Sequence, residues 1–294
     1  MAGAAWRITV LTGSAVAALF LASCARGGSP VPHRAISVVP QRIVQAPMSL
    51  RSVAEPQANG LMWVLAGSPS QGLFRMNSTT GRVTGSTAVS GAAKSVAEST
   101  TGMIGLALGT PRSGALELRD GQTGKVVKTV PLPGPARGVV VGSDGTTFYV
   151  LTKRSGVASA SIVTTPAGRV RGTVPMPSDT VSVVPDLPQA TLFALERNGQ
   201  VDRISISGGK VMARFKVGDT GRSLALSPNG STLYVLKSAG AVANIAVVRT
   251  ATESVRRVLP APRYSTEVLV SPSGSQLYAV VGTARYGNIQ VFAA

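Results

Sequence analysis

The chain has 294 residues, of which only 4% are aromatic, and it is rich in Val, Thr, Ser and Gly. This composition favours short strands over long amphipathic helices. The 29 Lys and Arg residues against 12 Asp and Glu give a formal net charge of +17, which suits anionic partners such as phospholipid headgroups, cell-wall polymers or nucleic acid. A solubilising, Arg-rich surface is the alternative explanation of the charge.

Residues 1–23 have the features of a secretory signal peptide. Arg7 precedes an apolar run from Ile8 to Leu21 that is short for a membrane span but suits a signal sequence. The run ends in Leu-Ala-Ser-Cys24, which resembles the bacterial lipobox. The resemblance implies that Cys24 is acylated and anchors the protein to the extracytoplasmic face of the cell membrane. An ordinary signal peptide with an incidental Cys is the alternative.

Residues 24–35 are rich in Gly, Ser, Pro and Arg, and such a composition cannot bury a core. We interpret this segment as a flexible tether between the lipid and the folded domain. His33, the single His, falls in the tether, and Cys24 is the single Cys. A Ser-His-Asp triad, a multi-His metal site and an internal disulfide are therefore excluded.

Residues 36–294 contain a repeat with four turn-separated strand patterns. Successive repeats are 43, 43, 43, 42 and 44 residues apart, and their first strands open at Arg51, Lys94, Arg137, Thr180, Arg222 and Thr266. The second strands are marked by Trp63, Gly105, Tyr149, Phe193, Tyr234 and Tyr278. Four short strands in about 43 residues are the pattern of a β-propeller blade, so the sequence predicts an all-β, six-bladed propeller.

Two repeats carry a motif seen in a known family. Ser227-Pro-Asn-Gly230 is followed by Leu233-Tyr-Val, and Ser271-Pro-Ser-Gly274 by Leu277-Tyr-Ala. This resembles the YVTN-type repeat of the lactonase-like propeller superfamily. The resemblance implies a propeller fold and says little about function. The first, second and fourth repeats depart from the motif, and six repeats are fewer than the seven that are common in the family.

The two ends of the repeat region complement each other. The last repeat stops at Phe292, after its third strand, while residues 36–45 form a strand pattern before the first repeat. We expect this N-terminal strand to complete the last blade and close the ring, which removes unpaired sheet edges.

The residues that open the first strands form a candidate binding site. The first strand of a propeller blade is innermost, so Arg51, Lys94, Arg137, Thr180, Arg222 and Thr266 are expected around one mouth of the central channel. Four neighbouring cations repel one another unless an anion or acidic side chains offset them. Arg suits forked contacts with phosphate or carboxylate oxygens. The alternative is local neutralisation of Arg51 and Lys94 by Glu55 and Glu98, four residues further along the same strands.

Other recurring residues have structural interpretations. Arg82, Lys125, Arg169 and Lys210 follow Gly turns, where exposed cations promote solubility and protect edges. Aromatic residues that recur at one strand position indicate core or between-blade packing.

We interpret the protein as a monomeric binding or scaffold module without a cofactor. Its expected partner is an anionic ligand, a cell-envelope polymer or an acidic protein, with nucleic acid less favoured. The alternative is a lactonase-like hydrolase with a divalent metal in the channel, for which Glu55 and Glu98, with Glu267 or Asn244, are weak candidate ligands. Nucleotide-binding Gly-rich loops are missing from the sequence.

Overall fold

The computed structural model describes residues 39–57, 59–67, 71–90, 92–239, 242–283 and 286–294. The proposed signal peptide, the tether, Cys24 and His33 lie outside these residues. Residues 36–294 form one compact unit. No helix in the described part of the chain is both long enough and apolar enough to cross a membrane.

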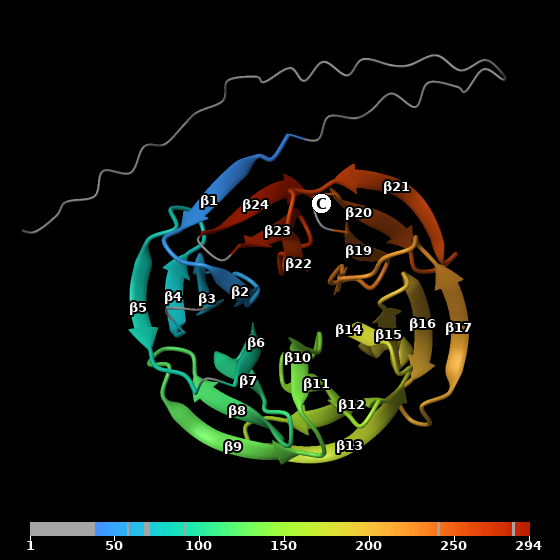
Figure 1. Ribbon diagram of the computed structural model, residues 1–294, viewed down its shortest axis with the longest axis horizontal. Helices are drawn as coiled ribbons and strands as arrows, with labels where there is room; N and C mark the ends of the chain where they lie inside the picture. Colours follow the sequence, from blue (N-terminus) through green and yellow to red (C-terminus); the bar gives the residue numbers. More distant parts are fainter. Residues whose placement is uncertain (1–38, 58, 68–70, 91, 240–241, 284–285) are drawn as a thin grey trace, which may run out of the picture. The chain divides into compact units, whose positions relative to one another are not determined.

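The described residues form six antiparallel four-stranded sheets, arranged radially around a central opening (Figure 1). This confirms the all-β, six-bladed propeller. Blades 1 to 3 comprise β2 (Leu50–Val53), β3 (Leu61–Ala66), β4 (Leu73–Asn77) and β5 (Val83–Thr87); β6 (Ala93–Glu98), β7 (Met103–Gly109), β8 (Gly114–Asp120) and β9 (Val126–Leu132); and β10 (Ala136–Val141), β11 (Thr147–Arg154), β12 (Val157–Thr164) and β13 (Arg169–Met176).

Blades 4 and 5 comprise β14 (Thr180–Asp186), β15 (Thr191–Glu196), β16 (Gln200–Ser205) and β17 (Val211–Lys216); and β18 (Ser223–Leu226), β19 (Thr232–Ala239), β20 (Val242–Arg249) and β21 (Ser254–Pro260). Blade 6 comprises β22 (Ser265–Val270), β23 (Gln276–Gly282), β24 (Gly287–Ala293) and β1 (Arg42–Ala46). A short 3-10 turn, η1 (Leu187–Gln189), joins β14 to β15.

Blade 6 contains both ends of the repeat region. β1 pairs antiparallel with β24, from Arg42 opposite Val291 to Ala46 opposite Gly287. Val44 and Ala46 are buried in a cluster that also holds residues of β2 and β3. The outer strand of the last blade therefore leads directly into the first blade.

The hairpin turns have the geometry that their sequence predicts. Gly230 and Gly274 adopt φ of 71° and 72°, which residues with a Cβ rarely reach. The Gly230 N–H donates to the Ser227 carbonyl at 2.8 Å, and the Gly274 N–H donates to Ser271 at the same distance.

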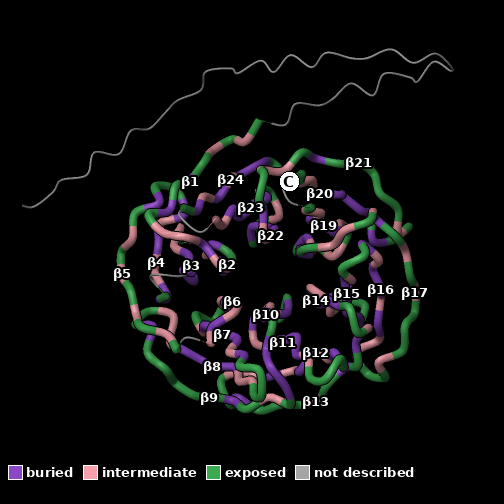
Figure 2. The backbone as a smooth tube through the Cα atoms, in the orientation of Figure 1, coloured by how far each residue is buried: buried purple, intermediate pink, exposed green. Residues whose placement is uncertain are grey.

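The core lies between neighbouring blades, where the second and third strands are mostly buried (Figure 2). The recurring aromatics are buried there, which confirms their packing role: Trp63, Tyr149, Phe193, Tyr234 and Tyr278. Trp63 also donates from Nε1 to the Gly121 carbonyl of blade 2 at 3.1 Å. Blade 2 has Gly105 at this position, and the ring of Phe148 from blade 3 fills the space.

Candidate anion site at the channel mouth

The innermost strands surround a central cavity of about 1200 Å³. These strands are β2, β6, β10, β14, β18 and β22. All of them but β18, which has no label in the picture, can be found around the opening in Figure 1. Because the blades are related by rotation about one axis, the inner strands all run in the same direction. Their first residues therefore share one mouth of the channel and their last residues share the other.

All six residues that sequence reasoning assigned to the mouth line this cavity. Three of the cations, Arg51, Lys94 and Arg137, lie at a β-bulge. In blade 1, Leu50 faces Ala66 and Ser52 faces Leu65, so that Arg51 is the extra residue. Lys94 and Arg137 are skipped in the same way. A bulge leaves its extra residue outside the regular pairing and re-aims its side chain.

Blades 4 to 6 present different residues at the equivalent position. Thr266 is the bulge residue of blade 6, and Arg222 directly precedes Ser223, the first paired residue of β18. In blade 4 the bulge residue is Val181, because Thr180 pairs with Glu196 and Ser182 with Leu195. The side chain that opens to the mouth in blade 4 is therefore apolar.

Thr180 lines the cavity as predicted, but its neighbour Val181 holds the bulge position in blade 4. Thr180 is 6% exposed, and its Oγ1 donates to the Pro177 carbonyl at 2.7 Å. Ser265 has the same place in blade 6 and donates from Oγ to Pro262 at 2.7 Å. The step from Arg137 to Thr180 is the regular 43 residues, so the spacing of the repeat favours Thr180 over Val181.

The four mouth cations make no ion pair with any described residue. Arg51 donates from Nη1 to the Ala93 carbonyl at 3.0 Å, which ties it to the neighbouring blade. Arg137 and Arg222 are exposed. Sequence reasoning missed two more cations of the lining, Lys153 near the end of β11 and Arg197 just after β15, because they belong to the second strands and not the first.

The proposed neutralisation of Arg51 and Lys94 by Glu55 and Glu98 does not occur as ion pairs among the described residues. Four residues along a strand separate the Cα atoms by about 13 Å. Glu55 is accessible but is surrounded by the channel wall, and this desolvation raises its pKa to about 7. Burial also raises the pKa of Glu98 to about 7, opposed by the charge of Arg75.

Glu267 lies inside the channel and links two blades. Its Oε2 accepts a hydrogen bond from the Val53 N–H at 2.9 Å, and its Oε1 accepts one from Ser52 Oγ at 3.2 Å. Burial raises the pKa of Glu267 to about 7, although both hydrogen bonds oppose the shift, and the charge of Glu55 adds to it. The carboxyl group therefore belongs to the seam between blades 6 and 1.

Similar side-chain links join other inner strands and form what we call the serine belt. In each, a Ser Oγ accepts a hydrogen bond from a backbone N–H of the next blade: Val96 to Ser52 at 3.3 Å, Val139 to Ser95 at 3.3 Å, Leu224 to Ser182 at 3.1 Å and Val268 to Ser223 at 3.2 Å. Gly138 stands at this position in blade 3 and has no side chain to accept. Each serine of the belt directly follows the residue that its blade presents at the mouth. The belt therefore also holds the backbone from which the mouth side chains extend.

The candidate metal ligands do not gather into a site. Among the described residues, no group of three or more His, Cys, Asp or Glu side chains could hold a metal ion. Asn244 lies on β20, the third strand of blade 5, and is not part of the channel lining.

The fold and this site define a six-bladed β-propeller whose channel carries, at one mouth, four cations that form no ion pair with the described residues. No protein-family model matches the chain, and no curated protein matches it.

Proposed function

We propose that the protein is a binding module that takes an anionic ligand at the mouth formed by Arg51, Lys94, Arg137 and Arg222. The observation that carries this proposal is the placement of four cations from four blades around one opening, without ion-pair partners among the described residues. Like charges held together in this way are stabilised when an anion lies between them.

The chemistry of the mouth favours a compact ligand with several negative charges. Three of the four cations are Arg, whose planar guanidinium makes paired contacts with phosphate or carboxylate oxygens. The acidic side chains Glu55 and Glu98 lie toward the other end of the inner strands, so the channel is cationic at one mouth and acidic toward the other. An anion is therefore drawn to one mouth only.

The remaining parts of this proposal rest on sequence. They are a signal peptide of residues 1–23, a lipid on Cys24, a tether of residues 24–35, an extracytoplasmic location and membership of the YVTN-type repeat family. Metabolic labelling with a fatty acid tests the anchor, because label should be lost in Cys24→Ser. Label retained by that variant would contradict acylation at Cys24.

Calorimetric titration with inorganic tripolyphosphate tests binding at the mouth. The mouth variant replaces Arg51, Lys94, Arg137 and Arg222 with Gln. We expect it to bind at least about tenfold more weakly, because four charge contacts of about 0.5 kcal/mol each are lost.

The matched control, which we call the rim variant, replaces four exposed cations of the outer blade edges with Gln: Lys125, Arg171, Lys210 and Arg256. It removes the same net charge and should bind tripolyphosphate as the wild type does. Equal losses in both variants would show that net charge, and not the mouth, determines binding. Unchanged affinity in the mouth variant would also contradict the proposal.

The metal-dependent hydrolase has no observation of its own in its favour within the described residues.

A further inference from the structure

The outer strands run head to tail around the circumference of the propeller, where Figure 1 shows them as long arcs. The turn before β13 packs on β9, and the turn before β17 packs on β13. A Cβ on Gly168 would lie 2.7 Å from Cδ of Lys128 on β9, and one on Gly209 would lie 2.7 Å from Cδ of Pro175 on β13. The outer strands β9, β13 and β17 therefore form one continuous arc.

The four outer strands of blades 2 to 5 carry charge of a single sign, although Glu253 directly precedes β21. The strands β9, β13, β17 and β21 contain no Asp or Glu and carry seven cations, namely Lys128, Arg169, Arg171, Arg214, Lys216, Arg256 and Arg257. Lys125 and Lys210 directly precede β9 and β17. We call these nine residues the cationic rim. It extends over blades 2 to 5.

The cationic rim is open to solvent. The first three residues or more of β9, β13 and β21 are exposed on both strand faces, as are the first two of β17 (Figure 2). A bulge near the start of each strand leaves one residue unpaired, and in two strands that residue is a cation, Arg171 or Arg256. The bulge also protects these edges from pairing with another sheet.

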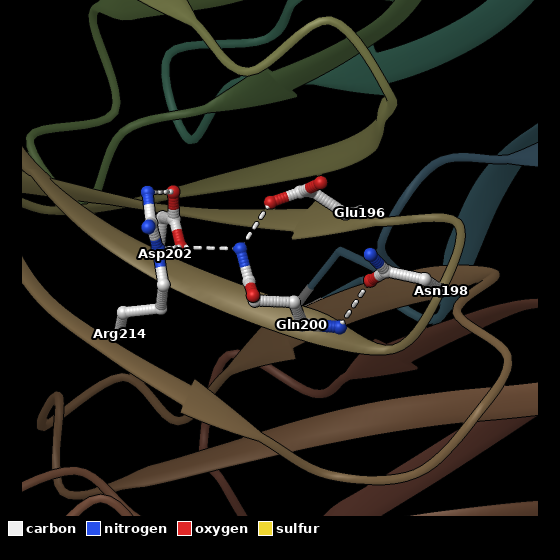
Figure 3. Close-up of polar contacts among 5 residues, drawn as sticks. All are labelled: Glu196, Asn198, Gln200, Asp202 and Arg214. Carbon is white, nitrogen blue, oxygen red and sulfur yellow. Dashed lines mark hydrogen bonds and ion pairs between the residues drawn. The ribbon is translucent and has the colours of Figure 1, made fainter.

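Most of the rim cations have no acidic partner among the described residues. The exceptions are both in blade 4. Arg214 donates from Nε to Asp202 at 2.9 Å and from Nη2 at 3.2 Å, within a network that includes Gln200 and Glu196 (Figure 3). Lys216 lies 3.7 Å from Asp219. The other seven rim cations are exposed and make no ion pair within the described part of the chain.

We propose that the cationic rim is a second binding site, separate from the mouth, for a linear polyanion bearing phosphate groups. The polymer follows the curve of the ring from blade 2 to blade 5 and contacts the exposed Lys and Arg side chains of each blade in turn. Its phosphates replace the counterions that a surface of this charge otherwise holds.

The geometry favours a flexible chain over other anionic partners. Each outer strand spans roughly 20 Å, so the cations are distributed along an arc much longer than any small anion. A flat bilayer meets a convex rim at one or two blades and leaves the others unused. The four strands carry a single aromatic residue, the half-buried Phe215, so the stacking on which single-stranded nucleic acids depend is missing.

The rim and the mouth are separable because they lie on opposite edges of each blade. The inner strands form the mouth and the outer strands form the rim, with two strands between them. A ligand at one site therefore does not contact the other, and each site can be removed by substitution without touching its counterpart.

Binding of inorganic polyphosphate of graded chain length tests the proposal. For the wild type, affinity should rise with chain length until the chain covers several blades, whereas a mouth site alone saturates with short chains. The rim variant should bind tripolyphosphate with wild-type affinity, but its affinity should no longer rise with polyphosphate chain length. For long chains, the slope of log affinity against log salt concentration should be less steep in the rim variant than in the wild type, by about 3–4. In the mouth variant, affinity should still rise with polyphosphate chain length.

Two further measurements make the result decisive. The substituted side chains are exposed, so the melting temperature of the rim variant should match the wild type, and the double variant Arg171→Gln, Arg256→Gln should show about half of the change in salt dependence. Long-chain affinity that is unchanged in the rim variant, or that does not rise with length in the wild type, would overturn the proposal. So would rim-dependent binding to vesicles containing phosphatidylglycerol without binding to polyphosphate.

Discussion

The carboxylate of Glu267 on β22 accepts a hydrogen bond from the backbone N–H of Val53 on β2, at 2.9 Å. This contact crosses the seam where the last blade meets the first. At other seams a Ser Oγ accepts the equivalent hydrogen bond. A carboxylate reaches further than a hydroxyl and also accepts from Ser52, so the closing seam has two side-chain links.

Glu267→Ala should destabilise the propeller by about 1–3 kcal/mol, because it leaves the Val53 N–H without its acceptor in a buried place. Glu267→Gln should cost much less, since the amide oxygen still accepts that hydrogen bond. The free energy of unfolding in urea measures both. Ser223→Ala, which removes a single link from Val268, is the matched control at another seam. Equal stability of the Glu267→Ala and wild-type proteins would show that the seam is held by apolar packing alone.

Stability should fall as the pH rises from about 5 to about 8. Glu55, Glu98 and Glu267 have pKa values raised from 4.5 to about 7 in the folded protein. Between these values the folded state binds more protons than the unfolded state, so raising the pH favours unfolding. Above about pH 8 the carboxyls are ionised in both states and the dependence should level off.

Thermal melting at constant ionic strength between pH 5 and pH 8.5 tests this sign. The triple variant Glu55→Gln, Glu98→Gln, Glu267→Gln should show a much flatter profile and a higher melting temperature than the wild type at pH 8. Asp120 and Asp144, whose pKa values hydrogen bonds lower, affect stability only at more acidic pH. A wild-type melting temperature that increases from pH 5 to pH 8 would contradict the assignment of these three carboxyls.

Removing the N-terminal strand should cost most of the stability of the domain. A chain that starts at residue 47 lacks β1, which exposes the edge of β24 and uncovers the cluster in which Val44, Ile289 and Val291 are buried. A chain that starts at residue 36 retains the strand and is the control. Calorimetric melting compares the two, and equal melting temperatures would show that β1 contributes little to closure.

Sequence was sufficient for the architecture because each blade repeats its turns and apolar strands at an almost constant spacing. It also placed Arg51, Lys94, Arg137 and Arg222 around one opening. It did not reveal that Val181, and not Thr180, is the bulge residue of blade 4, because bulges leave no mark in composition. The acidic residues Glu55 and Glu98 were assigned a neutralising role from spacing alone, which carries no information on the direction of a side chain.

The arrangement of the cationic rim could not be predicted from sequence either. The cations after the Gly turns were visible in the sequence and suggested a solubilising role. Their significance depends on two facts that only coordinates supply. The outer strands are joined end to end into an arc, and acidic partners are found for Arg214 and Lys216 but not for the other rim cations among the described residues.

Gly105 and Phe148 provide a test of how neighbouring blades share space. Each of the other five blades has a large aromatic residue where blade 2 has Gly105, and a Cβ at Gly105 would lie 2.6 Å from Cε1 of Phe148. Gly105→Ala should therefore destabilise the protein by about 1–3 kcal/mol through overpacking. Phe148→Leu alone should also destabilise it, because it removes part of a fully buried ring.

The double variant Gly105→Ala, Phe148→Leu should be more stable than the sum of the two single changes allows, since the smaller Leu makes room for the new methyl group. Urea unfolding of all four proteins yields the coupling energy, which we expect to be about 1 kcal/mol in favour of the double variant. Strictly additive effects would mean that the Phe148 ring does not fill the space left by Gly105. The interface between blades 2 and 3 would then need another explanation for the missing aromatic residue.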